Sequence, residues 1–385
     1  MAKHRTRPLG GVAMKVALDV SAVPVKIAGA GRYIAELACR LPEVNVTTTL
    51  VTRRGDTTRW RALSPRAEVT GLVPNGRVAR LAYEAWLVGA SATARGADLW
   101  HAPHYTMPRR GSTPTVVTIH DLTFFTNPEW HERSKVAFFR RAITYSARHA
   151  RVLVSVSEAS ARLLESTIPG HAPIVVAPLG VELAVFQPAD RDDESTLHAH
   201  GLRADVPYIF FVGTVEPRKG LDVLLQAFRG IASDDLEVEL WLAGQAGWGG
   251  SPIEAQIDGH PYNARIRRLG FVDDALLPVL YRRARVVTYP SRGEGFGLPV
   301  LEAMACGASV VTSSDTVMAE VAGDGARLVP VGDAGALAAS LVEVLESSDD
   351  ERRQWSRRAR ARAERFTWEA CVAQHLVAYR QALGG

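Results

Sequence analysis

Two glutamates and the glycines around them form the stretch of this sequence that is best suited to chemistry. Glu294 lies in the glycine-rich run 291–297, and Glu302 follows eight positions later in an apolar segment. A carboxylate accepts two hydrogen bonds, so it suits the neighbouring hydroxyl groups of a sugar. Taken singly, either glutamate is more simply explained as an exposed loop or helix residue. Together with the three glycines around Glu294, the pair predicts a ligand site.

Two apolar strands are predicted on either side of this stretch. Residues 285–290 and 308–312 are short β-branched runs, typical of strands that are buried on both faces. Pro299 and Gly307 mark the start and the end of a short helix between them. Parallel sheets bind ligands beyond the carboxyl ends of their strands, where loop N–H groups and a helix N-terminus attract anions. The stretch is therefore predicted to lie at such an edge.

A pair of basic residues follows another predicted strand, residues 208–212. Gly213 opens the turn, and Arg218 and Lys219 come just before a predicted helix at 221–228. A guanidinium can bind two oxygens of a diphosphate, and an ammonium adds a point charge. Two exposed basic residues at a turn are the alternative. Only five of the 45 basic residues are lysines, which draws attention to Lys219.

Two loops of the first half also follow predicted strands. His120 comes directly after the β-branched run 115–119, where a parallel sheet presents functional groups, although a histidine there can equally cap a helix. Gly29 and Gly31 follow a first strand at 14–20 and precede a helix at 33–41. Glycines at this place let backbone approach a ligand, but a lone Gly-x-Gly is more often a simple turn.

Taken together, these motifs resemble a known family. The string Glu294-Gly-Phe-Gly-Leu-Pro-Val-Leu-Glu-Ala-Met-Ala-Cys-Gly307 resembles the Glu-x7-Glu signature of the retaining glycosyltransferases of family GT4. The strings Gly213-Thr-Val-Glu-Pro-Arg-Lys-Gly220, His120-Asp-Leu122 and Gly29-Ala-Gly-Arg-Tyr33 are similar to three further motifs of that family. The resemblance covers residues 14–385, with Leu179-Gly-Val-Glu182 as a small departure from the usual Asn-Gly-Val-Asp. It implies an α/β protein of the GT-B fold, with two Rossmann-like parallel-sheet domains that face a cleft.

The resemblance also implies a role for each motif residue. Arg218 and Lys219 would hold the donor diphosphate, Glu294 the sugar hydroxyls and Glu302 the ribose diol, while His120 would meet the sugar near its reacting carbon. The expected catalytic residues are His120, Arg218, Lys219 and Glu294. The expected donor-binding residues are Gly29, Gly31, Gly213, Thr214, Phe271, Val272, Gly295, Phe296, Gly297, Leu298 and Glu302. The reaction implied is glycosyl transfer with retention by front-face attack, in which Glu294 is not a nucleophile.

Length and composition predict the domain organisation and the general class of the protein. A chain of 385 residues exceeds what one core usually holds, so two domains are predicted. The predicted parts are a disordered extension (1–13), an acceptor-side domain (14–186), a linker (187–206), a nucleotide-sugar-binding domain (207–365) and a C-terminal helix that packs back on the first domain (366–385). Apolar residues make up 47% and charged residues 22%, as in ordinary globular proteins.

Composition also argues against some partners and cofactors. The net charge of +4 comes with a strong arginine bias. The sequence shows neither the aromatic residues nor the groove-matching features of nucleic-acid binding, so no nucleic-acid partner is expected. Three scattered cysteines indicate neither a disulfide framework nor a metal site and favour a reducing cytoplasm. Asp190-Arg-Asp192 has the form of a metal-binding Asp-x-Asp, but its acidic surroundings favour a linker. We expect no metal and no cofactor beyond the substrate.

The remaining predictions concern the substrates, the location and the alternative functions. The loop motifs resemble those of bacterial mannosyl and rhamnosyl transferases, so GDP-mannose is the first donor to consider, with a glycan or lipid-linked acceptor as in polysaccharide biosynthesis. Residues 130–151 are predicted as a basic, aromatic helix that either contacts an anionic membrane from the cytoplasmic side or presents a solvated face. A GT-B phosphorylase, a sugar-nucleotide epimerase and a non-catalytic sugar-nucleotide-binding protein remain alternatives. The sequence leaves the sugar, acceptor, linkage and oligomeric state open.

Overall fold

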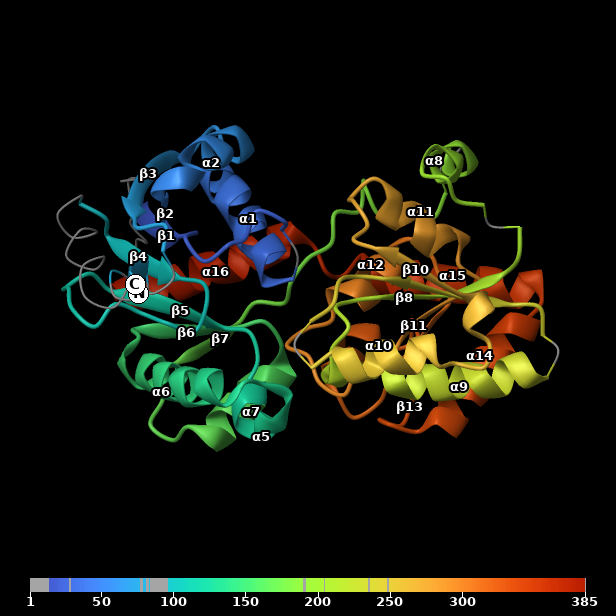
Figure 1. Cartoon of the computed structure of the whole chain (residues 1–385). Helices are drawn as coiled ribbons and strands as arrows, with labels where there is room; N and C mark the ends of the chain where they lie inside the picture. The colour runs from blue at the N-terminus through green and yellow to red at the C-terminus, as the bar shows by residue number, and fades with distance from the viewer. Residues whose placement is uncertain are drawn as a thin grey trace, which may run out of the picture. The chain divides into compact units, whose positions relative to one another are not determined.

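The computed structural model describes residues 14–27, 29–76, 79–80, 83, 96–189, 192–203, 205–234, 236–247 and 249–384. These residues form two sheets flanked by helices, and strands pair in parallel in both sheets (Figure 1). The predicted α/β class with two parallel sheets is confirmed. The predicted extension 1–13 lies outside the described residues.

One compact unit comprises residues 1–118, 145–154 and 375–385. Its elements are β1 (Met14–Asp19), α1 (Ala30–Arg40), the 3-10 helices η1 (Leu41–Val44) and η2 (Arg54–Asp56), β2 (Val46–Arg53), α2 (Thr57–Leu63), β3 (Glu68–Val73) and β4 (Leu99–Ala102), with all but the last residue of β5 (Thr115–Ile119) and β6 (Val152–Ser155). The first sheet has the order β3-β2-β1-β4-β5-β6-β7. Since the chain proceeds outward from β1 in both directions, the order reverses between β1 and β4, and the loop that carries Gly29 leaves the sheet at this point.

A buried polar cluster fixes the end of the chain within the first unit. The last helix, α16 (Trp368–Leu383), contributes His375 and Tyr379. The Tyr33 hydroxyl lies 2.7 Å from His375 Nε2 and 2.7 Å from Thr118 Oγ1, and His101 Nδ1 lies 2.8 Å from the Tyr379 hydroxyl. All five side chains are fully buried. Because buried polar groups need such partners, this cluster specifies how the end of α16 packs.

The second unit comprises residues 119–144 and 155–374. Its elements are α5 (Thr123–Thr126), η3 (Pro128–Trp130), α7 (Glu158–Thr167), β7 (Ile174–Val176), α8 (Asp193–Ala199), β8 (Tyr208–Val212), η4 (Pro217–Lys219), α9 (Leu221–Ser233), β9 (Glu239–Ala243), α10 (Ser251–Asp258), η5 (Asn263–Arg265), β10 (Ile266–Gly270), α11 (Leu276–Arg283), β11 (Val286–Tyr289), α12 (Leu298–Ala305), β12 (Val310–Ser313), α13 (Val317–Ala322), β13 (Arg327–Val329), α14 (Ala334–Glu346) and α15 (Asp349–Ala363). Helix α6 (Arg133–His149) has residues in both units.

The second sheet has the order β10-β9-β8-β11-β12-β13. Its central strands β8 and β11 are short apolar runs with nearly every residue buried, as their sequences predict. Helices α9 and α14 pack against each other on one face of this sheet, while α11 lies on the other (Figure 1). Helix α9 covers the sheet because its apolar residues recur at helical spacing, with Leu224, Phe228 and Ile231 buried.

Four local expectations need correction or completion. Gly31 was expected in a loop, but α1 begins at Ala30, and Gly31 lies in its first turn against Val23 and Ile27. The polar segment 55–75, which gave no prediction, holds α2 and β3. The sequence also predicts a strand at 268–272, and this strand is β10, which begins two residues earlier. The predicted linker contains α8, and its Asp190 lies outside the described residues. The predicted domain boundaries stay predictions.

Candidate active site

The carboxyl ends of β8 and β11 mark the point where the strand order of the second sheet reverses. From β8 the chain continues through β9 and β10 on one side, whereas β11, β12 and β13 follow on the other. The two strands pair in parallel, so their carboxyl ends, Val212 and Tyr289, lie at the same edge. Loops diverge at such a switch point and leave a crevice in which α/β proteins bind ligands.

Two loops leave this edge and are held against each other. Gly220, at the end of the first loop, has φ of 70°, and a Cβ on it would lie 2.0 Å from the carbonyl oxygen of Pro290 in the second. The Arg292 N–H donates to the Arg218 carbonyl at 2.8 Å. The Arg292 guanidinium also forms a two-pronged ion pair with Asp222, at 2.8 and 2.6 Å. These contacts bring the predicted basic turn and the predicted glutamate loop together.

The centre of the site is an ion-pair cluster around Glu294. Its Oε2 accepts a hydrogen bond from Arg218 Nη1 at 2.8 Å, and its Oε1 accepts one from Lys219 Nζ at 2.5 Å. The Tyr289 hydroxyl accepts from the same ammonium group at 2.6 Å and donates to Glu294 Oε1 at 3.0 Å. The Ser291 hydroxyl lies 3.1 Å from that oxygen. The side chains of Lys219 and Glu294 are 9% and 11% exposed, so the pair is largely withdrawn from water.

The electrostatics follow from this geometry. Burial alone would raise the pKa of Glu294, but Lys219 and Arg218 outweigh it and lower that pKa to about 2. Burial lowers the pKa of Lys219, and Glu294 opposes this. The pKa of the Tyr289 hydroxyl is raised well above its usual value by burial and by the Glu294 charge. At neutral pH the cluster therefore holds an ionised carboxylate and a protonated phenol.

Residues 119–144 contribute a second wall of the site in the same unit. A Cβ on Gly295 would lie 2.1 Å from the His120 carbonyl oxygen, and a Cβ on Gly293 would lie 2.9 Å from the Trp130 ring. The structure thus brings the His120 loop to the Glu294 loop through main-chain contact, and the His120 side chain is buried. Close approach is possible here because both loop positions are glycine.

A short hydrogen-bonded chain shapes this wall. Asp121 Oδ1 accepts from the N–H and the hydroxyl of Thr123, at 3.0 and 2.7 Å, and these two hydrogen bonds hold the loop. Since the Thr123 proton is used in that bond, the 2.9 Å contact between Thr123 Oγ1 and His131 Nε2 requires His131 to donate. Burial lowers the pKa of His131. The His131 ring is therefore neutral, with its proton on Nε2 and an acceptor lone pair on Nδ1.

The other expected donor-binding residues lie in several places. Gly297, with φ of 102°, precedes α12, and Phe296 and Leu298 are buried around it. Glu302 accepts a hydrogen bond from the Tyr281 hydroxyl at 3.1 Å, and no direct contact joins it to Glu294 among the described interactions. Gly213, Thr214, Phe271 and Val272 follow β8 and β10 at the carboxyl edge of the sheet, whereas Gly29 and Gly31 belong to the first unit.

Sequence reasoning missed several residues of the cluster. Tyr289 and Ser291 both contact Glu294, and Glu216 contacts Arg218. A signal existed for Tyr289, because it is the only residue with a phenol in the predicted strand 285–290 and stands at its carboxyl end. Trp130 and His131 carried no comparable signal. They are distant in sequence, and only the fold places Trp130 beside Gly293.

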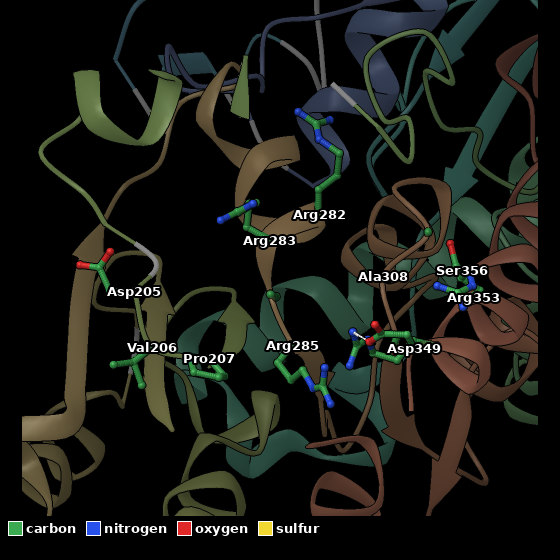
Figure 2. Close-up of a pocket in the computed structure, with 14 residues that line it drawn as sticks. Asp205, Val206, Pro207, Arg282, Arg283, Arg285, Ala308, Asp349, Arg353 and Ser356 are labelled. Carbon is green, nitrogen blue, oxygen red and sulfur yellow. Dashed lines mark hydrogen bonds and ion pairs between the residues drawn. The ribbon is translucent and has the colours of Figure 1, made fainter. Parts of the chain in front are cut away.

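A separate cavity of about 560 Å³ opens at the opposite edge of the second sheet. Figure 2 shows Pro207, Arg285 and Ala308 in its lining; they lie near the amino ends of β8, β11 and β12, respectively. Two further lining arginines, Arg282 and Arg352, form ion pairs with aspartates. None of the residues around Glu294 described above lines this cavity, so we assign the site by its charged cluster and not by cavity size.

Two features of the described residues concern metals and membranes. No group of three or more His, Cys, Asp or Glu side chains in that part of the chain is arranged to hold a metal ion. Asp190 lies outside it, and metal independence stays a prediction. No helix in the described ranges is both long and apolar enough to cross a bilayer.

Comparison with known proteins gives consistent results. Residues 192–362 match a family model described as glycosyl transferases group 1, and residues 27–185 match one described as glycosyltransferase family 4. The O-antigen chain mannosyltransferase B of Escherichia coli is 33% identical over 284 residues, which is 73% of this chain and 74% of that protein.

Two solved structures are similar in fold. Sucrose-phosphate synthase from Thermosynechococcus elongatus has a TM-score of 0.77 at 22% identity, over 96% of this chain and 99% of that one. The Anabaena protein HepE, solved with UDP and glucose, has a TM-score of 0.74 at 21% identity, over 95% of this chain and 100% of that one. At these identities the likeness shows the fold alone, and it agrees with the GT-B fold expected from the sequence.

Proposed function

The chain belongs to glycosyltransferase family 4, the group 1 glycosyltransferases, and from this we propose that it moves a hexose from a nucleoside diphosphate sugar to a glycan or lipid-linked acceptor, with retention at the anomeric carbon. One observation carries the proposal. Arg218, Lys219 and Glu294 come from two loops and meet at the switch point of the second sheet. Two cations suit a diphosphate, and a carboxylate beside them suits the attached sugar.

The chemistry is that of charge separation. As the bond between the anomeric carbon and the diphosphate oxygen lengthens, positive charge develops on the sugar and negative charge on the leaving group. Arg218 and Lys219 would stabilise the leaving diphosphate, helped by the N–H groups at the start of α12. Glu294 would hold sugar hydroxyls, and His120 would lie near the reacting carbon. In front-face attack the departing phosphate accepts the acceptor's proton, so no residue of the chain serves as nucleophile.

Mannose is the proposed sugar and GDP-mannose the proposed donor. The support is the similarity to the O-antigen chain mannosyltransferase B of Escherichia coli together with the loop motifs of the sequence. The Anabaena protein of similar fold was solved with UDP and glucose, so UDP-sugars belong in any test. Phe271, which is 46% exposed after β10, offers a ring on which a nucleobase can stack.

Location is a further proposal. We place the protein in the cytoplasm, with residues 130–151 as a peripheral contact to anionic lipid. The support is α6, which carries Lys135, Arg140, Arg141 and Arg148 and exposes 41% of Phe138. Flotation with phosphatidylglycerol vesicles tests this contact, and an absence of binding at low salt would remove it.

A donor screen tests the proposed function. The purified protein is incubated with GDP-mannose, UDP-glucose, ADP-glucose and dTDP-rhamnose, with and without a glycan acceptor, and release of nucleoside diphosphate is measured. We expect acceptor-dependent release from one donor, GDP-mannose first, and a product whose anomeric configuration by NMR matches that of the donor. Inversion would contradict the retaining mechanism. Conversion of the donor without an acceptor would favour an epimerase, release of sugar phosphate a phosphorylase, and binding without turnover a non-catalytic protein.

A further inference from the structure

We propose that Glu216 is a displaceable counter-ion of the diphosphate site: its carboxylate occupies Arg218 while the site is empty and leaves when the diphosphate binds. The inference rests on the proposed function, because it takes Arg218 and Lys219 as the groups that hold the diphosphate. Glu216 lies two residues before Arg218, at the start of the 3-10 helix η4. Its Oε2 accepts a hydrogen bond from Arg218 Nε at 2.9 Å.

The charges around Arg218 balance without any ligand. The cluster contains two cations, Arg218 and Lys219, and two carboxylates, Glu216 and Glu294, joined by three ion pairs. Arg292 does not add a free charge, because it is paired with Asp222. A donor diphosphate brings about two negative charges to this neutral group. Since an uncompensated charge in a partly buried site is costly, the donor diphosphate competes with these two carboxylates for their cations.

Geometry indicates which carboxylate gives way. Glu294 is held by Arg218, Lys219, Tyr289 and Ser291, and its side chain is 11% exposed. Glu216 forms one ion pair among the described residues, with Arg218, and its side chain is 24% exposed. Rotation of Glu216 into water breaks fewer contacts and recovers more hydration than removal of Glu294. Glu216 is therefore the carboxylate that a diphosphate displaces at the lower cost.

The surrounding backbone leaves room for the Glu216 side chain in its present position. The loop after β9 runs beside it, with the Val215 N–H donating to the Gln245 carbonyl at 2.9 Å and the Gly247 N–H donating to the Val215 carbonyl at 3.1 Å. A Cβ on Gly247 would lie 2.4 Å from Glu216 Cγ and 2.8 Å from its Oε1. Glycine at 247 thus leaves the space that this side-chain position requires.

Displacement has a consequence for the reaction cycle. After transfer the nucleoside diphosphate remains on Arg218 and Lys219, and the Glu216 carboxylate competes with it for Arg218. Return of Glu216 to the guanidinium would favour departure of the product. Removing the negative charge of Glu216 should therefore strengthen product binding, whereas removal of a residue that only supports the fold would weaken binding or leave it unchanged.

Calorimetric titration of wild type and Glu216→Gln tests the proposal. The ligands are GDP, UDP, ADP, dTDP and inorganic pyrophosphate, each at low salt. For the nucleotide that wild type binds, we expect the variant's Kd to fall about three- to tenfold, the scale of one partly exposed ion pair. Inhibition by that nucleotide in the transfer assay should strengthen by the same factor. Glu346→Gln, which removes the same charge from an exposed position on α14, is the control and should leave the Kd unchanged.

Every other outcome contradicts the displacement model or the proposed function. A Kd for Glu216→Gln equal to or higher than that of wild type would overturn the displacement model and leave the proposed function standing. A decrease that Glu346→Gln reproduces would show only a general effect of net charge and would also overturn it. If folded wild type binds none of the five ligands, the diphosphate site itself is wrong, and the proposed function fails with it.

Discussion

The pKa of the Glu294 carboxyl group is set by the cations beside it. Its pKa is about 2 in the folded protein against an ordinary 4.5. Folding therefore stabilises the ionised carboxylate far more than the protonated one. Because the folded pKa is the lower one, the stabilisation is fully present above about pH 5 and is lost as the pH falls toward 2. Neutral pH lies well inside the range in which Glu294 can hold sugar hydroxyls as a charged acceptor.

The dependence of stability on the ionisation of Glu294 gives a prediction for Glu294→Gln. We expect the variant to have a lower free energy of unfolding than wild type by about 2–3 kcal/mol at pH 6, with the difference shrinking as the pH falls from 5 to 3. Urea unfolding of both proteins across this range measures it. Glu43→Gln removes an exposed partner of Arg66 and should cost less than about 1 kcal/mol at each pH. A difference for Glu294→Gln that does not change with pH would contradict the assigned ion pairs.

At the scale of elements, the site exists because two strand-to-helix loops leave neighbouring strands and touch. Gly220 makes this contact possible: its φ of 70° is in the left-handed region, and any Cβ would overlap the Pro290 carbonyl oxygen. The turn after β8 can therefore carry Arg218 and Lys219 close to the Glu294 loop only if residue 220 is glycine.

Alanine substitutions at two glycines separate this effect from helix propensity. Gly220→Ala should destabilise the second unit by about 2–4 kcal/mol, from backbone strain and from overlap with Pro290, and should reduce sugar transfer. Gly230→Ala, in the last turn of α9 with open space around it, should instead stabilise by about 0.5–1 kcal/mol. Chemical unfolding of both variants measures the contrast. Equal stability of Gly220→Ala and wild type would mean that the two loops are not held together as described.

The elements that sequence patterns predicted are those with strong periodicity. The β-branched run at 115–119 and the apolar run at 208–212 correspond to β5 and β8, and Pro299 and Gly307 bracket α12 as expected. Strand β3 was missed because Glu68, Thr70 and Gly71 interrupt its apolar pattern. The start of α1 was placed too late because glycine is a poor helix former, whereas Gly31 lies buried in the first turn of this helix.

Contacts within the candidate site could be predicted only in part. The meeting of Arg218, Lys219 and Glu294 was implied by the family resemblance, because each belongs to a motif at a strand end. The partners Tyr289 and Glu216 were missed, since their roles depend on hydrogen-bond geometry and not on residue type. The same holds for Trp130, which reaches Gly293 only through the fold.

At the scale of the whole molecule, the chain forms two compact units that are not continuous in sequence. Residues 119–144 belong to the second unit, and the chain ends in the first. His375 and Tyr379 join that first unit through a buried polar cluster with Tyr33 and His101. Such pairings between distant segments have no signature in local sequence, which explains why polar residues at these positions drew no attention there.

The activity of the molecule is proposed to depend on one buried ammonium group. Lys219 is the residue of the cluster that contacts both Tyr289 and Glu294, and its proposed task is to stabilise the departing diphosphate. Replacing it with alanine removes this charge but leaves Arg218 to pair with Glu294. We therefore expect the folded state of Lys219→Ala to survive while the chemistry fails.

Turnover of Lys219→Ala is the most direct measurement of the central claim. With the donor that wild type uses, we predict a decrease in kcat/KM of about a hundredfold or more, the usual cost of removing a group that stabilises developing charge, together with a native circular dichroism spectrum. Lys15→Ala, which truncates an exposed lysine on β1, should keep wild-type turnover. Near-normal turnover of folded Lys219→Ala would contradict the assignment of the cluster as the donor diphosphate site.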